Sequence, residues 1–224
     1  MNILAIETAT PVCAIALRSA NSEVVRVLDE DRRHTEVLAA GVAMLLEESG
    51  LRARDLDRVV VDVGPGLFTG LRVGIATAIG LAEGVGCASV EVTSLELLAH
   101  GAHGRGARGR LVSCVDGRRG EIFVQSFELS DAVLALDAPV VRTARDVVIE
   151  WATNGVGVTF TGDGVQRYVK DFSAVPNGTI LDETVPSLKA ALELGAHRAP
   201  SSTITPVYLR EADAVANFST RSRQ

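Results

Sequence analysis

Each half of the 224-residue chain opens with the same pattern, and this repetition constrains the fold more than any other feature. Residues 3–28 contain three short apolar runs joined by tight turns, which is typical of a strand meander. A similar strand–turn–strand–strand pattern returns over residues 111–136, and helical patterns follow in both halves. The Gly- and Arg-rich residues 103–110 between them are typical of a flexible connector. The repeat lies in the pattern rather than in sequence identity, and it predicts two related α/β lobes, residues 1–102 and 103–224.

Composition narrows the classes of function open to such a chain. Lys and Arg total 22 and Asp and Glu total 28, which gives a net charge of −6, and 47% of the residues are hydrophobic. This balance is typical of a globular protein. It excludes a chain-wide basic surface for nucleic acid, although not a local one.

Cysteine spacing indicates a reducing environment, and the first residues do not resemble an export signal. Cys13, Cys87 and Cys114 are too far apart for a metal or redox pair, so we expect small buried core residues. The N-terminal segment lacks the basic stretch of a signal peptide. Polar and glycine residues interrupt the longest apolar region, residues 73–90. We therefore expect no membrane span and a cytoplasmic protein.

Hydrophobic periodicity predicts the elements along the chain. Strands are predicted over residues 3–6, 12–17, 24–28, 56–63, 87–92, 111–115, 121–129, 133–136 and 156–161. Helices are predicted over residues 33–49, 70–84, 94–100, 143–152, 165–172 and 187–198. Thr143 and Ser187 are the expected N-caps of the helices that they begin, and residues 218–224 are expected to fray.

Two helices in the first half carry more apolar surface than one sheet needs to cover. On the helix of residues 33–49, apolar positions span an arc of roughly 220°, whereas a helix with one buried face needs roughly 100°. The helix of residues 70–84 has only three polar residues. We predict a protein–protein interface built from both helices; the alternative is that they cover each other and the sheet completely. The residues predicted on this interface are Leu38, Val42, Leu45, Leu46, Leu71, Ile75, Ala78 and Ile79.

A Gly-rich segment lies between a predicted strand and a predicted helix, where backbone N–H groups can hold an anion. Its main residues are Gly64, Pro65, Gly66, Phe68, Thr69, Gly70, Arg72 and Gly74. The segment has neither the Gly-Lys-Ser/Thr of a P-loop nor the spacing of a dinucleotide fingerprint. A phosphate site and a purely structural tight turn both remain open.

The turns that follow the first strand of each half are further candidates for contact with a nucleotide or a partner. Glu7 and Thr8 lie in the first turn, although the side chains after them work against close approach of phosphate. The second turn contains Asp116, Arg118 and Arg119. Its arginines can bind phosphate or a partner's carboxylates, and the alternative is that they are only solvated.

Other catalytic arrangements are not supported. His34 lacks the second histidine of a helical zinc site, and no serine lies in a Gly-x-Ser-x-Gly elbow. We therefore predict no metal site and no catalytic residue. The arginines of residues 105–110 either contact RNA phosphates or are simply solvated.

Several motifs together resemble one family, in order over nearly the whole chain. They are residues 3–10, the Gly-rich residues 64–74, the turn of residues 116–121, Gly162-Asp163-Gly164 and residues 206–210. These resemble the TsaB (YeaZ) family. The usual family form has Ser where this chain has Leu67, and Thr35 similarly replaces a Ser after His34.

The resemblance implies a two-lobed actin-like ATPase fold (ASKHA, ribonuclease H-like) with duplicated β-β-β-α-β-α units and a reduced second lobe. It implies a non-catalytic scaffold that pairs with TsaD through first-lobe helices, recruits TsaE, and serves N6-threonylcarbamoylation of adenosine beside the anticodon of tRNAs that read A-starting codons. It implies tRNA contact through the complex, and ATP or ADP only within the complex. Exposed apolar surface on the two helices also suits a homodimer when the partner is absent, which the sequence leaves open.

Two other classes of function stay open at this point. A stand-alone small-molecule kinase or ATPase of the same superfamily would require tight ATP binding by this chain. A peptidase would require a metal or nucleophile arrangement, which the sequence does not display.

Overall fold

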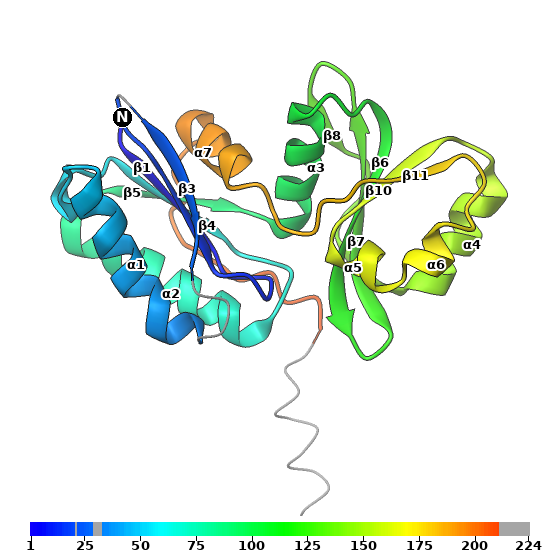
Figure 1. The fold of residues 1–224 in the computed structure, drawn as a ribbon, viewed down its shortest axis with the longest axis horizontal. Helices are drawn as coiled ribbons and strands as arrows, with labels where there is room; N and C mark the ends of the chain where they lie inside the picture. The colour runs from blue at the N-terminus through cyan, green and yellow to red at the C-terminus, as the bar shows by residue number, and fades with distance from the viewer. Residues whose placement is uncertain (21, 29–32, 211–224) are drawn as a thin grey trace, which may run out of the picture.

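The computed structural model describes residues 1–20, 22–28 and 33–210 as two lobes, each built on one mixed β-sheet (Figure 1). The first sheet has the order β3-β2-β1-β4-β5. Its strands are β1 (Ile3–Glu7), β2 (Ala14–Arg18), β3 (Glu23–Val27), β4 (Arg58–Asp62) and β5 (Ala88–Val92). The three-strand meander is antiparallel, while β4 and β5 run parallel to β1.

The second sheet repeats this topology. Its strands are β6 (Gly109–Arg118), β7 (Glu121–Leu129), β8 (Val133–Ala135), β10 (Val158–Thr161) and β11 (Gly178–Ile180). Read from β8, the order β8-β7-β6-β10-β11 matches the first sheet strand for strand, and β9 (Val140–Thr143) adds a pairing to β7. The duplication expected from the sequence pattern is therefore confirmed.

Helices cover both faces of each sheet. In the first lobe, α1 (His34–Glu48) and α2 (Phe68–Val85) lie side by side on one face, and α7 (Leu188–His197) covers the other. The short helix η1 (Ala53–Asp55) precedes β4. In the second lobe, α3 (Ser94–Gly104) covers one face, while α4 (Ala144–Asn154), α5 (Asp163–Arg167) and α6 (Val169–Phe172) cover the other.

The predicted division of the chain at residues 102 and 103 is wrong for two helices. Although α3 belongs to the first half of the sequence, it packs mainly on β6 and β7 of the second sheet. Helix α7 comes from the second half, yet it packs on β1, β2 and β4. The two helices contact each other between the lobes, so each lobe is completed by a helix from the other half.

Most other predicted elements are confirmed within a few residues. Thr143 and Ser187 cap their helices, because each side-chain oxygen accepts the backbone N–H three residues later. The connector expected at residues 103–110 is shorter in the structure, because α3 ends at Gly104 and β6 begins at Gly109, which leaves residues 105–108 as the loop. The short strands β9 and β11 were not predicted, and the predicted tail, residues 218–224, lies outside the described residues.

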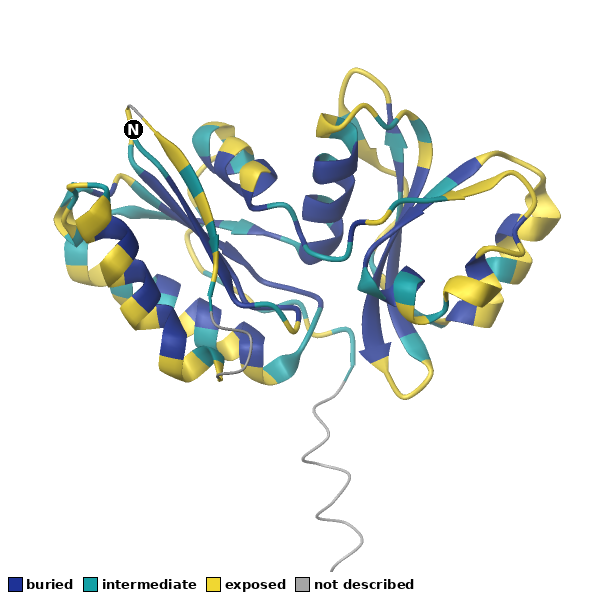
Figure 2. Cartoon of the chain, in the orientation of Figure 1, coloured by how far each residue is buried: buried dark blue, intermediate teal, exposed yellow. Residues whose placement is uncertain are grey.

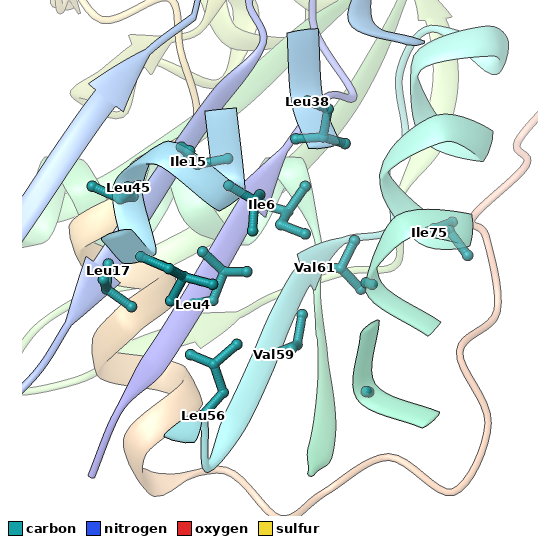
Figure 3. Packing of buried hydrophobic residues seen from close by; sticks show 14 of the residues in the cluster. Leu4, Ile6, Ile15, Leu17, Leu38, Leu45, Leu56, Val59, Val61 and Ile75 are labelled. Carbon is teal, nitrogen blue, oxygen red and sulfur yellow. The ribbon is translucent and has the colours of Figure 1, made fainter. Parts of the chain in front are cut away.

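The core of the first lobe lies between its sheet and the helices α1 and α2. Leu4, Ile6 and Ile15 project from the strands toward Leu38 and Leu45 of α1 (Figure 3). Because side chains alternate along a strand, Ile3 and Ala5 point to the opposite face, where α7 covers them.

Candidate functional site

Seven of the eight residues predicted on a partner interface are buried within the first lobe. Ile79 alone among them is half-buried, and the buried seven are Leu38, Val42, Leu45, Leu46, Leu71, Ile75 and Ala78. Most of them pack against the sheet. A partner cannot reach these side chains in the folded lobe, so their assignment to an interface is wrong. The helical periodicity located the apolar residues but not the direction in which each points.

The surface that the two helices do expose is formed by smaller side chains, and we call it the outer helix face. Figure 2 shows buried and exposed residues alternating along α1 and α2. The outer helix face consists of Ala39, Ala40, Ala43 and Met44 on α1, and Val73, Ala76, Thr77 and Gly80 on α2. Met44 is 55% exposed, and a Cβ built on Gly80 would meet no atom within 4 Å. This stretch is mostly apolar and open, and the exposed Glu36 and Glu47 flank it on α1.

Helix α2 has two apolar sides. It is also more continuous than expected from the sequence, where polar and glycine residues interrupt the apolar region. Its 18 residues are long and apolar enough to cross a membrane by length and composition alone. One side of α2, however, packs into the core of the first lobe through Ile75, Ala78 and Ala82. A helix buried on one side and apolar on the other is suited to lie between its own sheet and a second protein surface.

The Gly-rich segment sets the start of α2 against the turn after β1. The Leu67 N–H donates to the Ala9 carbonyl at 2.6 Å, and the Thr8 hydroxyl donates to the Gly70 carbonyl at 2.9 Å. A Cβ at Gly66 or Gly70 would overlap the carbonyl oxygens of Ala9 and Thr8. This close approach requires glycine, so the segment has a clear structural role as a tight turn.

The two candidate contacts in the first turn are not accessible. Glu7 and Thr8 are fully buried, which rules out direct contact with a nucleotide in this conformation. Burial raises the pKa of the Glu7 carboxyl well above its ordinary value, and the charge of Asp62 raises it further. Glu7 is therefore part of the interior of the lobe.

A cavity of about 170 Å³ lies between the lobes, where the loop from β4 to α2 faces the end of β6. It is lined by Gly66, Leu67, Phe68, Asp116, Gly117, Arg118, Phe123 and residues 207–210. Ligand pockets usually enclose about 300 Å³ or more. The predicted residues Asp116 and Arg118 thus reach an interlobe cavity, but one smaller than most small-molecule sites.

Residues 198–210, which we call the C-terminal strap, close this cavity along one side. The Val207 N–H donates to the Val63 carbonyl at 2.8 Å. The Tyr208 ring lies 5.1 Å from the Phe68 ring, and Arg72 stacks on Phe68 and donates to the Tyr208 hydroxyl at 3.3 Å. The sequence singled out residues 206–210 as a motif, but no spacing rule joins them to Phe68.

The strap also reaches the second lobe. Arg210 donates to the Gly117 carbonyl at 3.0 Å and to the Glu121 carboxylate at 3.1 Å. Both acceptors belong to the turn between β6 and β7. The strap therefore links the two lobes at the same place where the cavity lies.

Arg118 in this turn is paired within the chain. Its guanidinium lies 3.2 Å from the Asp116 carboxylate, which also accepts the Arg118 N–H. Arg118 and Arg119 both adopt left-handed backbone conformations, with φ of 64° and 56°. Arg119 is exposed and is not among the residues that line the cavity. The turn thus brings Arg118, but not Arg119, to the interlobe site.

The arginines of the predicted RNA-contacting loop also have partners in the chain. Arg105 pairs with Glu183, and Arg110 pairs with Glu128 at 2.9 Å. Arg108 donates to two backbone carbonyls of its own loop. These contacts favour the interpretation that the loop does not contact RNA. Within residues 1–20, 22–28 and 33–210, no three His, Cys, Asp or Glu side chains gather as a metal site requires.

Comparison with known proteins places this geometry in a family. The family model of TsaD, described as tRNA N6-adenosine threonylcarbamoyltransferase, matches residues 28–215. The tRNA threonylcarbamoyladenosine biosynthesis protein TsaB of Escherichia coli is 32% identical over 167 residues, 70% of this chain and 72% of that protein. TsaB of Bacillus subtilis is 31% identical over 62% of this chain and 60% of its own length.

A solved structure has the same fold. YeaZ from Pseudomonas aeruginosa superposes with a TM-score of 0.80 over 93% of this chain and 99% of its own, at 24% identity. The duplicated sheets, the expected actin-like arrangement of the two lobes and the sequence matches all agree. The chain belongs to the TsaB (YeaZ) family of tRNA threonylcarbamoyladenosine biosynthesis proteins, which share the fold of TsaD.

Proposed function

We propose that this chain takes part in N6-threonylcarbamoylation of tRNA as a non-catalytic scaffold subunit that pairs with TsaD in the cytoplasm. Its relatives in Escherichia coli and Bacillus subtilis carry the name of that biosynthesis, and the matching family model is that of the transferase. In the proposal, TsaD performs the transfer. TsaE and tRNA then meet this chain only in the assembled complex.

The observation that carries the scaffold role is the outer helix face. Ala76, Gly80 and Gly84 recur every four positions along α2, so a second helix can approach its backbone closely. Met44 on α1 adds a large, flexible apolar side chain that is 55% exposed. Monomeric proteins rarely leave a continuous apolar patch of this kind uncovered.

The shared fold supports TsaD as the partner. Because the TsaD family model matches residues 28–215, a TsaD chain has helices equivalent to α1 and α2. Two chains with the same pair of helices can join through a near-twofold contact, in which like surfaces meet. TsaD thus pairs as a related chain, and a second copy of this chain covers the same face when TsaD is absent.

The interlobe site supports a role without catalysis by this chain alone. The cavity there is about 170 Å³, and the C-terminal strap closes one side of it. Both features disfavour a nucleotide at this cavity, as the alternative of a stand-alone kinase or ATPase requires. A larger pocket of about 580 Å³ between α3 and α7 shares none of its lining residues. ATP or ADP is then bound only within the complex.

Reconstitution tests the proposal. Purified TsaD, TsaE and the enzyme that makes threonylcarbamoyl-AMP are incubated with tRNA, with and without this chain, and the modified adenosine is measured by mass spectrometry. The proposal predicts modification that depends on this chain, while the chain alone neither turns over ATP nor modifies tRNA. Calorimetric titration showing tight ATP binding by the isolated chain would favour the kinase alternative.

A further inference from the structure

Two carboxyl side chains meet inside the first lobe. Glu7 ends β1 and Asp62 ends β4, one position beyond the paired residues Ile6 and Val61 of these parallel strands. Both side chains are fully buried, and the strand register places them side by side on neighbouring strands. Neither residue touches the interlobe cavity or the outer helix face, so the proposed function leaves this pair unexplained.

A count of hydrogen bonds leaves one oxygen of each carboxyl without a donor. Glu7 Oε1 accepts the Thr10 N–H at 3.0 Å and the Thr10 hydroxyl at 3.1 Å. Asp62 Oδ1 accepts the Gly64 N–H at 2.7 Å and the Ser94 hydroxyl at 2.9 Å. Among the described residues, no group donates to Glu7 Oε2 or Asp62 Oδ2. Leaving such atoms unpaired in the interior is costly.

A single proton removes this conflict. Two ionised carboxylates cannot hydrogen-bond each other, and two buried like charges side by side are strongly unfavourable. If one carboxyl is protonated, its O–H donates to the other, and both remaining oxygens are satisfied. A bound metal ion fits less well, because calcium or magnesium takes about six or more oxygen ligands, whereas only two oxygens here lack a partner.

The surrounding charges favour protonation. Burial is the largest influence that raises the pKa of both carboxyls, and Glu7 is raised further by the charge of Asp62. Glu96 on α3 raises the pKa of Asp62 as well, although Arg198 of the strap pairs with Glu96. The Cys13 thiol, on the opposite side of the turn, has its own pKa raised mainly by burial and then by the charge of Glu7.

We infer that Glu7 and Asp62 bind one proton between them, and that this proton ties together the two turns beneath the N-terminus of α2. Glu7 holds the turn after β1 through Thr10, and Asp62 holds the loop before α2 through Gly64. The turn after β1 contacts the start of α2, because the Ala9 carbonyl accepts from Leu67 and the Thr8 hydroxyl donates to Gly70. Glu7 and Asp62 are thus positioning residues for the helix that carries the outer helix face.

Loss of the proton separates the turn after β1 from the loop before α2. Two buried negative charges repel, the turns move apart, and the start of α2 loses its support. The folded chain then becomes less stable as pH rises above the ordinary carboxyl pKa. Through α2, pairing with TsaD weakens as well, and this consequence alone rests on the proposed function.

Infrared spectroscopy of the isolated wild-type chain tests the proton itself. At neutral pH, where exposed carboxyls are ionised, we expect the carbonyl stretching band of one protonated carboxyl group. The band is absent from the Glu7→Gln variant and present in Asp171→Asn, a matched change at an exposed carboxyl on α6. Wild-type protein with no protonated carboxyl at neutral pH would overturn the inference, whatever the variants do.

Denaturation across pH tests the link to stability. A carboxyl whose pKa is raised by folding binds its proton more tightly in the folded chain, so stability falls as pH rises from the ordinary carboxyl pKa toward the raised value. We expect the urea midpoint of wild type and Asp171→Asn to fall in parallel over this interval. In Glu7→Gln the fall becomes shallower, because the amide donates to Asp62 without titrating. Asp62→Asn serves in the same way if Glu7→Gln does not fold, and profiles that coincide with wild type would contradict the inference.

Binding to TsaD as a function of pH separates this inference from the proposed function. If the infrared band is present but no TsaD complex forms at any pH, the proton is confirmed and the partner is wrong. If the complex forms and its affinity falls with rising pH in wild type but not in Glu7→Gln, both are confirmed. A complex whose pH dependence is the same in both proteins would show that the proton does not position α2.

Discussion

Met44 and Leu45 are neighbours on α1, yet they point to opposite sides of the helix. Met44 is 55% exposed on the outer helix face, whereas Leu45 is 1% exposed and packs in the core of the first lobe. The proposed partner surface therefore starts one residue away from the core. This relationship decides which substitutions change folding and which change binding.

Leu45→Ala should destabilise the chain rather than affect an interface. Truncating a fully buried leucine removes its packing and leaves a cavity, and we expect a loss of about 2–5 kcal/mol in the free energy of unfolding. Met44→Ala, on the exposed side, should change it by less than about 0.5 kcal/mol. Urea denaturation of the isolated chain measures both, and equal effects would contradict the assignment of the two faces.

Two glycines of α2 should respond in opposite ways to alanine. Gly70→Ala places a methyl group against the Thr8 carbonyl, and we expect a loss of about 1–3 kcal/mol in the free energy of unfolding. Gly80→Ala adds its methyl in open space within a helix, and we expect a gain of about 0.5–1 kcal/mol. Thermal unfolding of the isolated chain distinguishes them. A Gly70→Ala variant as stable as wild type would show that the turn after β1 does not constrain the start of α2.

Tyr208→Ala should release the C-terminal strap. The substitution removes the contact with the Phe68 ring and the hydrogen bond from Arg72. Hydrogen exchange should then become faster at the Val207 amide, which donates to Val63, and in the turn that Arg210 holds. Tyr168→Ala, which changes a tyrosine of the second lobe away from the strap, is the control. Unchanged exchange at Val207 would mean that the ring contact does not hold the strap.

The three thiols should differ in reactivity. Burial raises the pKa of Cys13 to about 11 and raises that of the fully buried Cys114 still more, while Cys87 is half-buried. Because the thiolate is the reactive form, iodoacetamide at mildly alkaline pH should alkylate Cys87 first. Cys114 should react only after unfolding in urea. Peptide mass spectrometry gives the order, and early alkylation of Cys114 would contradict its place in the second-lobe core.

The sequence was sufficient for the architecture because its signals are local and repeated. Alternating apolar residues, the caps Thr143 and Ser187 and the recurrence of a three-strand opening all follow from rules that act over a few residues. Periodicity alone could not show that α3 and α7 each cross to the other lobe. For α7 that arrangement depends on contacts with β1, β2 and β4, which lie more than 120 residues before it in the chain.

The site was harder to predict than the fold for the same reason. A helical wheel identifies Leu45 and Met44 as apolar, but only the position of the sheet shows which one faces a partner. Glu7 and Asp62 are 55 positions apart, and parallel pairing of β1 with β4 brings them together. The contact of Tyr208 with Phe68 likewise follows from the path of the strap.

The most direct test of the account is whether the outer helix face pairs with TsaD. Met44→Glu should abolish a one-to-one complex with the TsaD of the same organism, measured by size exclusion with light scattering, because it places a charge within an apolar contact. Ile149→Glu is the matched control, since Ile149 is 53% exposed on α4 of the other lobe. The account predicts that both variants remain folded by circular dichroism and that only Met44→Glu loses the complex. An intact complex with Met44→Glu would contradict the assignment of this face to the partner.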